Sequence, residues 1–372
     1  MEPSKRRPTL VGLGVLVAAL LVRLVGIGWG LPNDLHDQSL HPDEPVIFLY
    51  SQRIEPAKLD FAPGFYNYGT LYLTLVRIST DMAEAYGAGP KDDSEHEQWQ
   101  AIGRYHLVGR VLSAVAGAAT AWLVFLVLLP RAGMFGSLFG AAAMALAPGH
   151  VVHSRFQTVD VLATFFLVAS LYFALRLGKD VGEELSDKAY LKLAAWSGVF
   201  AGLSAGTKYT GILALVALVA VVLLDRRSGG LKAVALAFAS ALVVFLLATP
   251  GAVTDSAAFF RDFRYEMTHT QTGHGLVFAG TASGFLYHLT NLGFALGVFM
   301  TAFGVAGLAR ASYRAHTWAL ALAAFALAYY VLIGRAEVKF MRYVFPLVPV
   351  LCVGFGWLLS RAHQSPNALL RV

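Results

Sequence analysis

The chain repeats long apolar runs from one end to the other, and this repetition limits the folds open to it. Ten runs are separated by short polar breaks: residues 9–30, 105–129, 132–148, 160–177, 189–205, 211–224, 231–248, 284–308, 317–333 and 344–359. Of the 372 residues, 57% are hydrophobic and 14% are charged, which is unlike a soluble domain. A membrane-spanning helix needs roughly 20 mostly apolar residues, so the sequence predicts an all-α polytopic membrane protein with about ten transmembrane helices.

Basic residues orient these predicted helices. Lys5, Arg6 and Arg7 precede the first run, which is too long for a signal-peptide core and has no small-residue cleavage site after it. We therefore expect a retained anchor. Since Lys and Arg collect in cytoplasmic loops, the N-terminus and the other basic breaks are expected in the cytoplasm of a multi-pass plasma-membrane protein. These bases explain the net charge of +6 without a nucleic-acid partner.

The same orientation leaves residues 31–104 outside as one long loop. Within this loop, residues 65–82 mix aromatic and charged side chains, namely Tyr66, Tyr68, Tyr72, Arg77 and Asp81. That pattern favours an amphipathic juxtamembrane helix or a re-entrant segment at the surface over a full span. The remaining outer segments are residues 149–159, 206–210, 251–283 and 334–343.

Carboxylates and bases gather on this outer side. The acids are Asp43 and Glu44 in the first loop and Asp160 at the end of the second. The bases are Arg155, Lys208, Arg335, Lys339 and Arg342. Outer bases run against the usual charge bias and indicate an anionic partner, although each can also snorkel singly to lipid headgroups.

Two local patterns near these residues allow a second explanation, one structural and one involving a metal. Asp43 and Glu44 directly follow Pro42, which suits a helix start because carboxylates favour the positive end of the helix dipole. His41 with Glu44, or His150 with His153, have a spacing that allows them to share a metal. No cofactor is certain from the sequence, and a divalent metal is left open.

Together these residues resemble the C-type (GT-C) glycosyltransferases that use lipid-phosphate sugars, close to the protein O-mannosyltransferases and the lipid A aminoarabinose transferases. In that family an Asp, usually followed by Glu, lies in the first outer loop and acts as the base, and Asp43 matches it. Arg155 and Asp160 resemble an Arg and an Asp of the second outer loop. Residues 208–211 and 339–346 resemble two later motifs.

The resemblance implies a GT-C-like fold in one transmembrane domain, residues 1–372, with residues 31–104 as the first outer loop and its juxtamembrane helix. Many relatives end in a soluble outer domain. Here the chain stops with residues 366–372, so we expect no soluble C-terminal domain.

The expected function is transfer of a hexosyl or pentosyl group from a polyprenyl-phosphate donor to an acceptor hydroxyl on the outer face. No nucleotide sugar is supplied there, so the sugar must arrive on a lipid carrier. Asp43 would act as the base of an inverting displacement, Glu44 would orient Asp43 or the acceptor, and Asp160 would position a substrate or a metal. Donor and phosphate binding is expected from Arg155, Lys208, Tyr209, Lys339 and Arg342.

Two other functions fit a membrane protein of this composition. A lipid or solute transporter would show paired repeats and ionisable groups near the bilayer midplane, whereas this sequence has no evident repeat and its charges gather at one face. In a non-catalytic scaffold that binds polyprenyl lipids, the paired carboxylates would be dispensable. The sequence leaves open whether the acceptor is a protein, a glycolipid or a polysaccharide, and the transferase is the function we expect.

Overall fold

Helices form the regular structure of the computed structural model, which describes residues 3–179 and 185–365. The longer helices are α1 (Pro3–Leu24), α2 (Asp43–Ser51), α3 (Leu71–Ala83), α4 (Glu95–Leu146), α6 (Val159–Leu175), α7 (Asp187–Ala205), α8 (Leu215–Asp225), α9 (Gly230–Ala248), α11 (Ser256–Thr272), α12 (Gly284–Leu296), α13 (Val298–Tyr313), α14 (Thr317–Gly334) and α15 (Val348–Gln364). Short helical turns are η1 (Pro56–Lys58), η2 (Glu84–Ala88), α5 (Pro148–His153), η4 (Tyr209–Ala214), α10 (Gly251–Thr254) and η5 (Met341–Val344). The part of the chain so described contains no β-strand, which confirms the all-α prediction.

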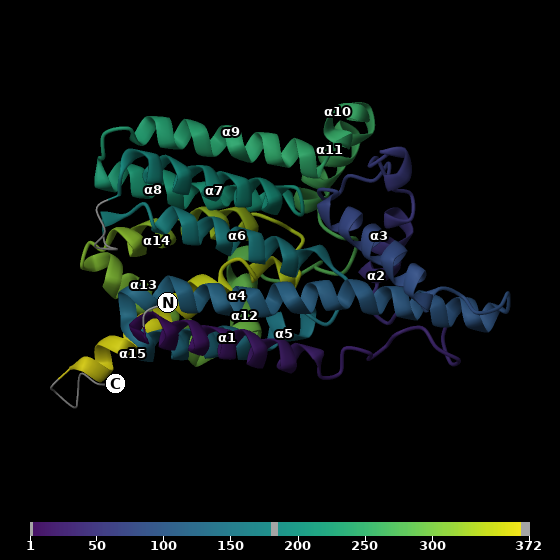
Figure 1. Cartoon of the computed structure of the whole chain (residues 1–372), viewed down its shortest axis with the longest axis horizontal. Helices are drawn as coiled ribbons and strands as arrows, with labels where there is room; N and C mark the ends of the chain where they lie inside the picture. The colour runs from purple at the N-terminus through teal and green to yellow at the C-terminus, as the bar shows by residue number, and fades with distance from the viewer. Residues whose placement is uncertain (1–2, 180–184, 366–372) are drawn as a thin grey trace.

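The long helices lie side by side in an elongated bundle (Figure 1). The first helix, α1, packs on α4, which also packs on α15, while α7 packs between α6 and α9. The helices of the first loop, α2 and α3, lie at one end of the bundle together with α10 and α11. Segments that are far apart in sequence therefore meet at the end of the bundle that holds α2, α3, α10 and α11.

Apolar helices support an integral membrane protein, but the predicted count of ten spans is not confirmed. Among residues 3–179 and 185–365, three helices are long and apolar enough to cross a membrane, namely α4, α9 and α14, and the bent pair α12–α13 makes four if it is one span. Three shorter apolar helices are Pro8–Leu24, Val159–Leu175 and Tyr209–Asp225. The sequence shows where residues are apolar, whereas breaks in the backbone decide how many uninterrupted turns they form.

Two predicted spans, 105–129 and 132–148, are the two halves of α4. This helix begins at Glu95, so its first turns fall in residues that the sequence assigns to the first outer loop. The helix reverses at Gly133, whose backbone is not helical. A Cβ atom added to Gly140 would lie 2.3 Å from Leu128, which shows that the second half packs back against the first.

The predicted span 284–308 is bent rather than straight. It divides into α12 and α13, which meet at an angle of 108°. Gly297 between them has φ +100°, a conformation that residues with a Cβ atom rarely adopt. The apolar composition of the run is continuous, so only this glycine marks the break in the sequence.

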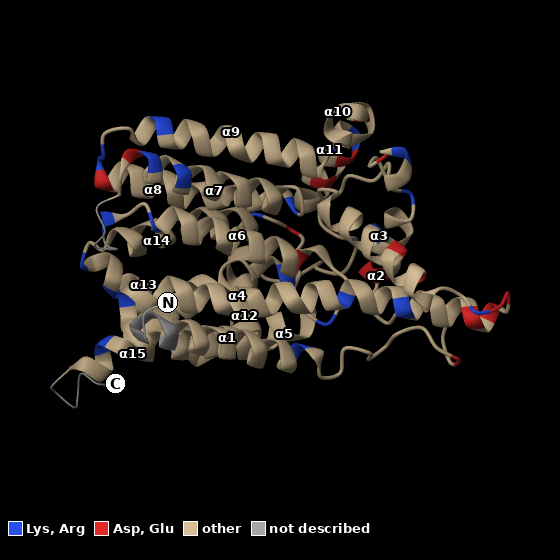
Figure 2. Cartoon of the chain, in the orientation of Figure 1, with Lys and Arg blue, Asp and Glu red and all other residues tan. Residues whose placement is uncertain are grey.

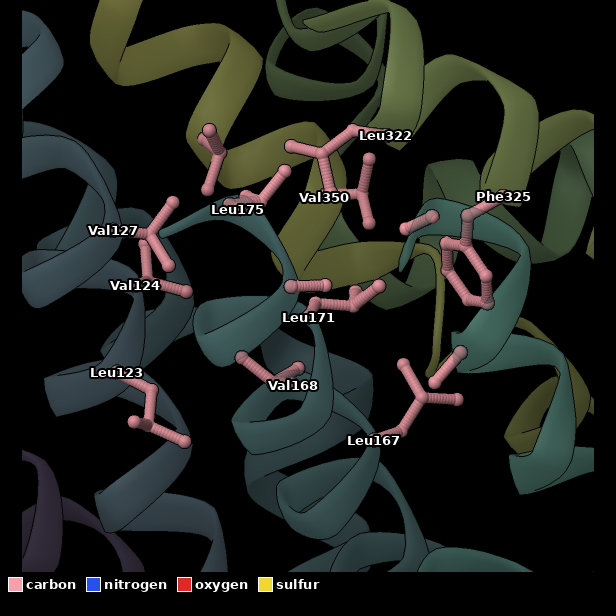
Figure 3. Close-up of a cluster of buried hydrophobic side chains, with 14 of the residues drawn as sticks. Leu123, Val124, Val127, Leu167, Val168, Leu171, Leu175, Leu322, Phe325 and Val350 are labelled. Carbon is pink, nitrogen blue, oxygen red and sulfur yellow. The ribbon is translucent and has the colours of Figure 1, made fainter. Parts of the chain in front are cut away.

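The centre of the bundle is a packed apolar core. Side chains of α4, α6, α14 and α15 meet there, among them Val124, Leu171, Leu322 and Val350 (Figure 3). Because lipid chains are as apolar as these side chains, close van der Waals packing is what stabilises this core in a bilayer. This core holds the helix ends that carry the polar residues in a fixed arrangement.

Charged residues are divided between the two ends of the bundle. The end with α2, α3 and α11 holds most of the acidic residues, and the opposite end holds mainly basic ones (Figure 2). In the first loop, α3 buries Tyr72, Leu73 and Val76 on one face and has only 13 residues, as befits the predicted juxtamembrane helix rather than a span. Residues 366–372, on which the prediction about the C-terminal end depends, lie outside the described residues.

Candidate active site

Asp43 is the first residue of α2 and lies in an open environment. The preceding Pro42 has φ −64°, the value a helix start needs. The Asp43 Oδ2 atom lies 3.3 Å from Nη2 of Arg342 in η5, and 26% of the Asp43 side chain is exposed. Asp43 therefore has one basic partner and remains accessible to a ligand.

Arg342 connects Asp43 to a second carboxylate, Asp160, at the start of α6. The Arg342 Nε atom lies 3.7 Å from Asp160 Oδ2, and the Lys208 ammonium donates to Asp160 Oδ1 at 2.6 Å. We call Asp43, Arg342, Asp160 and Lys208 the charged row, since acids and bases alternate along it. Burial alone would lower the pKa of Arg342, but the carboxylates of Asp160 and Asp43 hold that pKa above its ordinary value.

The charged row borders a small pocket of about 10 Å³, roughly the space of one water molecule. Asp160, Lys208 and Arg342 line it, together with Tyr329 of α14 and Pro346. Lys208 also lies 4.5 Å from the centre of the Tyr343 ring, a cation–π contact that fixes the ammonium beside the pocket. Charge and cavity thus coincide at the loop end of the bundle.

Glu44, the neighbour of Asp43, is instead completely enclosed. Arg110 of α4 binds it through two parallel hydrogen bonds of 2.8 and 2.7 Å, and both side chains have no exposed surface. Ser39 and the backbone N–H of Gln157 also donate to this carboxylate. Burial alone would raise the pKa of Glu44, but the hydrogen bonds and charge of Arg110 outweigh it and hold that pKa below its usual range.

Tyr209 fixes the first loop rather than entering the pocket. Its hydroxyl donates to the carbonyl oxygens of Tyr66 at 2.6 Å and Tyr68 at 2.9 Å. The first loop also packs closely on Gly206. A Cβ atom added to Gly69 of this loop would lie 2.1 Å from the Gly206 carbonyl oxygen. Only glycine fits at position 69, so the turn that carries Lys208 and the loop that follows Asp43 are in direct backbone contact.

The two predicted metal pairs do not lie as the sequence suggested. Glu44 is occupied by Arg110, and the His150 ring lies 3.4 Å from the Arg23 guanidinium. His41 lies instead next to His153, with 6.3 Å between ring centres. In residues 3–179 and 185–365, no cluster of three or more His, Cys, Asp or Glu is arranged to hold a metal.

Two predicted phosphate-binding residues point to other partners. Arg155 donates to the Val22 carbonyl oxygen of α1 at 3.0 Å. Lys339 is buried and donates to Glu337 at 3.0 Å and to Thr281 at 3.3 Å. Within the described residues, no hydrogen bond or ion pair joins either base to the charged row.

Sequence reasoning missed several side chains at this site. Tyr343 follows Arg342 directly in the sequence. An aromatic residue next to an outer base could have been predicted to contact a basic side chain of the site. Tyr68 lies near Asp43, which adds to burial in raising the pKa of the Tyr68 hydroxyl. Ser39 and the Gln157 backbone gave no signal, because any loop residue can supply a hydroxyl or an N–H to a carboxylate.

Residues 100–252 match the family described as Dolichyl-phosphate-mannose-protein mannosyltransferase, a stretch that includes Asp160 and Lys208 but not Asp43 or Arg342. No curated protein matches the sequence. ArnT from Cupriavidus metallidurans, bound to undecaprenyl phosphate, has a similar structure with a TM-score of 0.70 and 19% identity, covering 95% of this chain and 60% of that one. The apo oligosaccharyltransferase of Archaeoglobus fulgidus has a TM-score of 0.62 at 16% identity, covering 95% and 51%.

These likenesses extend over nearly the whole chain, although it spans only 60% of the length of the lipid-bound ArnT structure. At such identities they concern the fold. The predicted resemblance and the fold class are confirmed. The chain is therefore an integral membrane protein with the GT-C glycosyltransferase fold, resembling the protein O-mannosyltransferases and ArnT.

Proposed function

We propose that this protein is a membrane glycosyltransferase that moves a sugar from a polyprenyl-phosphate donor to an acceptor hydroxyl. The observation that carries the proposal is the charged row, in which the exposed carboxylate of Asp43 lies beside the bases of a pocket at one end of a GT-C fold. The lipid phosphates bound in the related structures support a lipid-linked donor: undecaprenyl phosphate in ArnT and a dolichol-phosphate in the archaeal enzyme AglB.

Lys208 and Arg342 are the proposed phosphate ligands. Both line the pocket, and both are already oriented by Asp160. Hydrogen bonds from charged donors to phosphate are stronger than neutral ones, and they strengthen as negative charge develops on the leaving phosphate. Arg155 and Lys339, which are bound elsewhere, support the neighbouring segments in this proposal.

Asp43 is the proposed general base. It would take the proton of the acceptor hydroxyl while the acceptor oxygen bonds to the anomeric carbon and the bond from that carbon to the phosphate oxygen breaks. Because the acceptor attacks opposite the leaving phosphate, the anomeric configuration inverts. Glu44 would act only through position, since Arg110 holds it and the first turn of α2 in place.

The proposed orientation puts the charged row on the outer face and the N-terminus in the cytoplasm. The basic residues at the opposite end of the bundle support this orientation, because such residues collect on the cytoplasmic side (Figure 2). The acceptor is then a hydroxyl-bearing molecule outside the cell membrane, and the carrier lipid reaches the pocket from the bilayer.

The deciding experiment compares purified wild type, Asp43→Asn and Asp37→Asn in lipid, using a panel of labelled polyprenyl-phosphate hexoses and pentoses with and without chelator. Asp37 is an exposed acid of the same loop and serves as the matched control. We expect transfer by wild type and by Asp37→Asn, and a loss of roughly 10²–10⁴-fold in Asp43→Asn, the usual contribution of a general base.

Each other outcome has a distinct meaning. Unchanged transfer by Asp43→Asn contradicts the role of Asp43. Binding of the donor by wild type without any transfer favours a lipid-binding scaffold, and vectorial movement of the labelled lipid without chemistry favours a transporter. Loss of transfer on adding chelator would establish a metal requirement.

A further inference from the structure

Two imidazoles next to the charged row have no role in the proposed reaction: His41 lies near Asp43, and His153 lies near Asp160 and Arg342. His41 lies two residues before Asp43, and His153 ends the short helix α5 on the other side of the site. Their rings are 6.3 Å apart and nearly perpendicular, at 82°. They are brought together by the fold alone, since 112 residues separate them in the chain.

Backbone groups fix the tautomer of each ring. The Asp43 N–H donates to His41 Nδ1 at 3.2 Å, so Nδ1 of His41 is an acceptor and its proton lies on Nε2. His153 Nδ1 lies 3.0 Å from the Gly149 carbonyl oxygen, which can only accept, so Nδ1 carries the proton and Nε2 has a free lone pair. One ring therefore offers a donor and the other an acceptor.

Both Nε2 atoms are available to a ligand. Among the described residues, neither has a hydrogen-bond partner and neither is sealed from solvent, unlike Nε2 of His150, which is buried without a partner. Burial lowers the pKa of His41, and it lowers the pKa of His153 to about 4. Both rings are therefore neutral near pH 7, and the donor and acceptor roles hold under ordinary conditions.

The surroundings of the two rings are aromatic. Phe156 lies 4.5 Å from His41 between ring centres, and Phe345 lies 4.8 Å from His153. A neutral donor and a neutral acceptor set among ring faces suit a hydroxyl group on a carbon framework, because a hydroxyl both donates and accepts while its carbons contact the rings.

We propose that His41 and His153 together bind a hydroxyl of the reacting substrates, with His41 Nε2–H donating to its oxygen and His153 Nε2 accepting its proton. The inference rests on the proposed function and deepens it, since it assigns a specificity-determining pair next to the base. The hydroxyl belongs either to the donated sugar or to the acceptor, and the experiment below distinguishes these sources.

The test measures binding and transfer with separate probes. Affinities of bare polyprenyl phosphate and of polyprenyl-phosphate sugars, including analogues that each lack one hydroxyl, are compared for wild type, His41→Phe, His153→Phe and the control His96→Gln. Phenylalanine keeps the ring packing and removes the nitrogens, and His96 is an exposed histidine of the same loop end. His41→Gln and His153→Gln restore an amide near the Nε2 position and report on rescue.

We expect wild type to bind the phosphate sugar roughly tenfold more tightly than one deoxy analogue, about the effect of one or two lost hydrogen bonds. In the Phe variants this preference disappears while affinity for bare polyprenyl phosphate is unchanged, and the Gln variants regain part of it. If the preference is lost only in transfer, with deoxy acceptors, the hydroxyl belongs to the acceptor.

Retention of full hydroxyl discrimination in both Phe variants, in binding and in transfer, overturns the proposal. So does stoichiometric metal in wild type that is absent from the variants, because the rings would then be metal ligands. A preference for one hydroxyl in binding, with no transfer by wild type, keeps the histidine pair and rejects the transferase function, so the two failures are distinguishable.

Discussion

Asp43 and Glu44 are adjacent in sequence, yet the fold gives them opposite surroundings. Glu44 has no exposed surface and is held by Arg110, Ser39 and a backbone N–H. Asp43 is 26% exposed and contacts one guanidinium atom at 3.3 Å. The Glu44 carboxylate is fully satisfied and closed, whereas the Asp43 carboxylate is partly satisfied and open.

This difference indicates a structural role for Glu44 and a reactive role for Asp43. Arg110 also donates to the carbonyl oxygens of Ile27 and Trp29, both at 2.7 Å, so the Glu44–Arg110 pair joins α2, α4 and the chain after α1. An intact buried pair of this kind adds little net stability, but removing one partner is strongly destabilising. The open Asp43–Arg342 pair can exchange a partner for a substrate, and each prediction below tests one side of this contrast.

The largest expected effect is on stability, from Arg110→Ala. Removing the guanidinium leaves a buried carboxylate without its charge partner, which typically costs 3–5 kcal/mol. We expect a strong fall in thermal unfolding temperature in detergent and poor recovery of folded protein. Arg53→Ala, which removes an exposed arginine over the Tyr50 ring, is the control. Equal stability of Arg110→Ala and wild type would show that the closed pair does not hold the loop.

A smaller effect, confined to substrate binding, is expected from Lys208→Met. A hydrogen bond from a charged donor contributes about 1.5–3 kcal/mol, so affinity for polyprenyl phosphate should fall roughly 10- to 150-fold. The unfolding temperature should fall less than in Arg110→Ala, because the buried Asp160 carboxylate keeps Arg342 at 3.7 Å as a second basic partner. Unaltered affinity for the lipid phosphate contradicts the phosphate role of the charged row.

Tyr209→Phe should have a more modest effect that distinguishes positioning from contact. The change removes the one hydroxyl proton that the carbonyl oxygens of Tyr66 and Tyr68 share and keeps the ring, at a cost of about 1–3 kcal/mol. We expect kcat to fall several-fold while the Kd for polyprenyl phosphate stays constant. A rise in that Kd with kcat unchanged would show instead that the hydroxyl touches the donor.

The smallest expected effect is the change in stability when the pH is lowered. Because the pKa of Glu44 is lowered in the folded protein, its contribution to stability is complete above the ordinary glutamate pKa of 4.5 and is lost as the pH falls through the lowered value. Unfolding temperatures of wild type should therefore decline more steeply than those of Glu44→Gln as the pH is lowered below the ordinary glutamate pKa. Parallel curves would contradict a lowered pKa at Glu44.

Much of this protein was predictable because composition is a strong signal in a membrane. Apolar runs predicted an all-α membrane protein, and the order of acidic and basic motifs predicted the GT-C resemblance. The bend within the predicted span 284–308 was not foreseen, since a bend at one glycine leaves the apolar composition unchanged. Asp43, Asp160, Lys208 and Arg342 were all candidates from the sequence, and the structure brings them into one row.

The sequence by itself determined that this protein lies in a membrane and which reactive side chains it carries, because hydrophobicity and residue type are local properties. Only the tertiary structure decided which acid is closed and which is open, and which histidines meet. Exposure and partnership depend on segments as distant as residues 41 and 153, or 44 and 110. Such pairings are set by how helices pack in three dimensions, which no local pattern specifies.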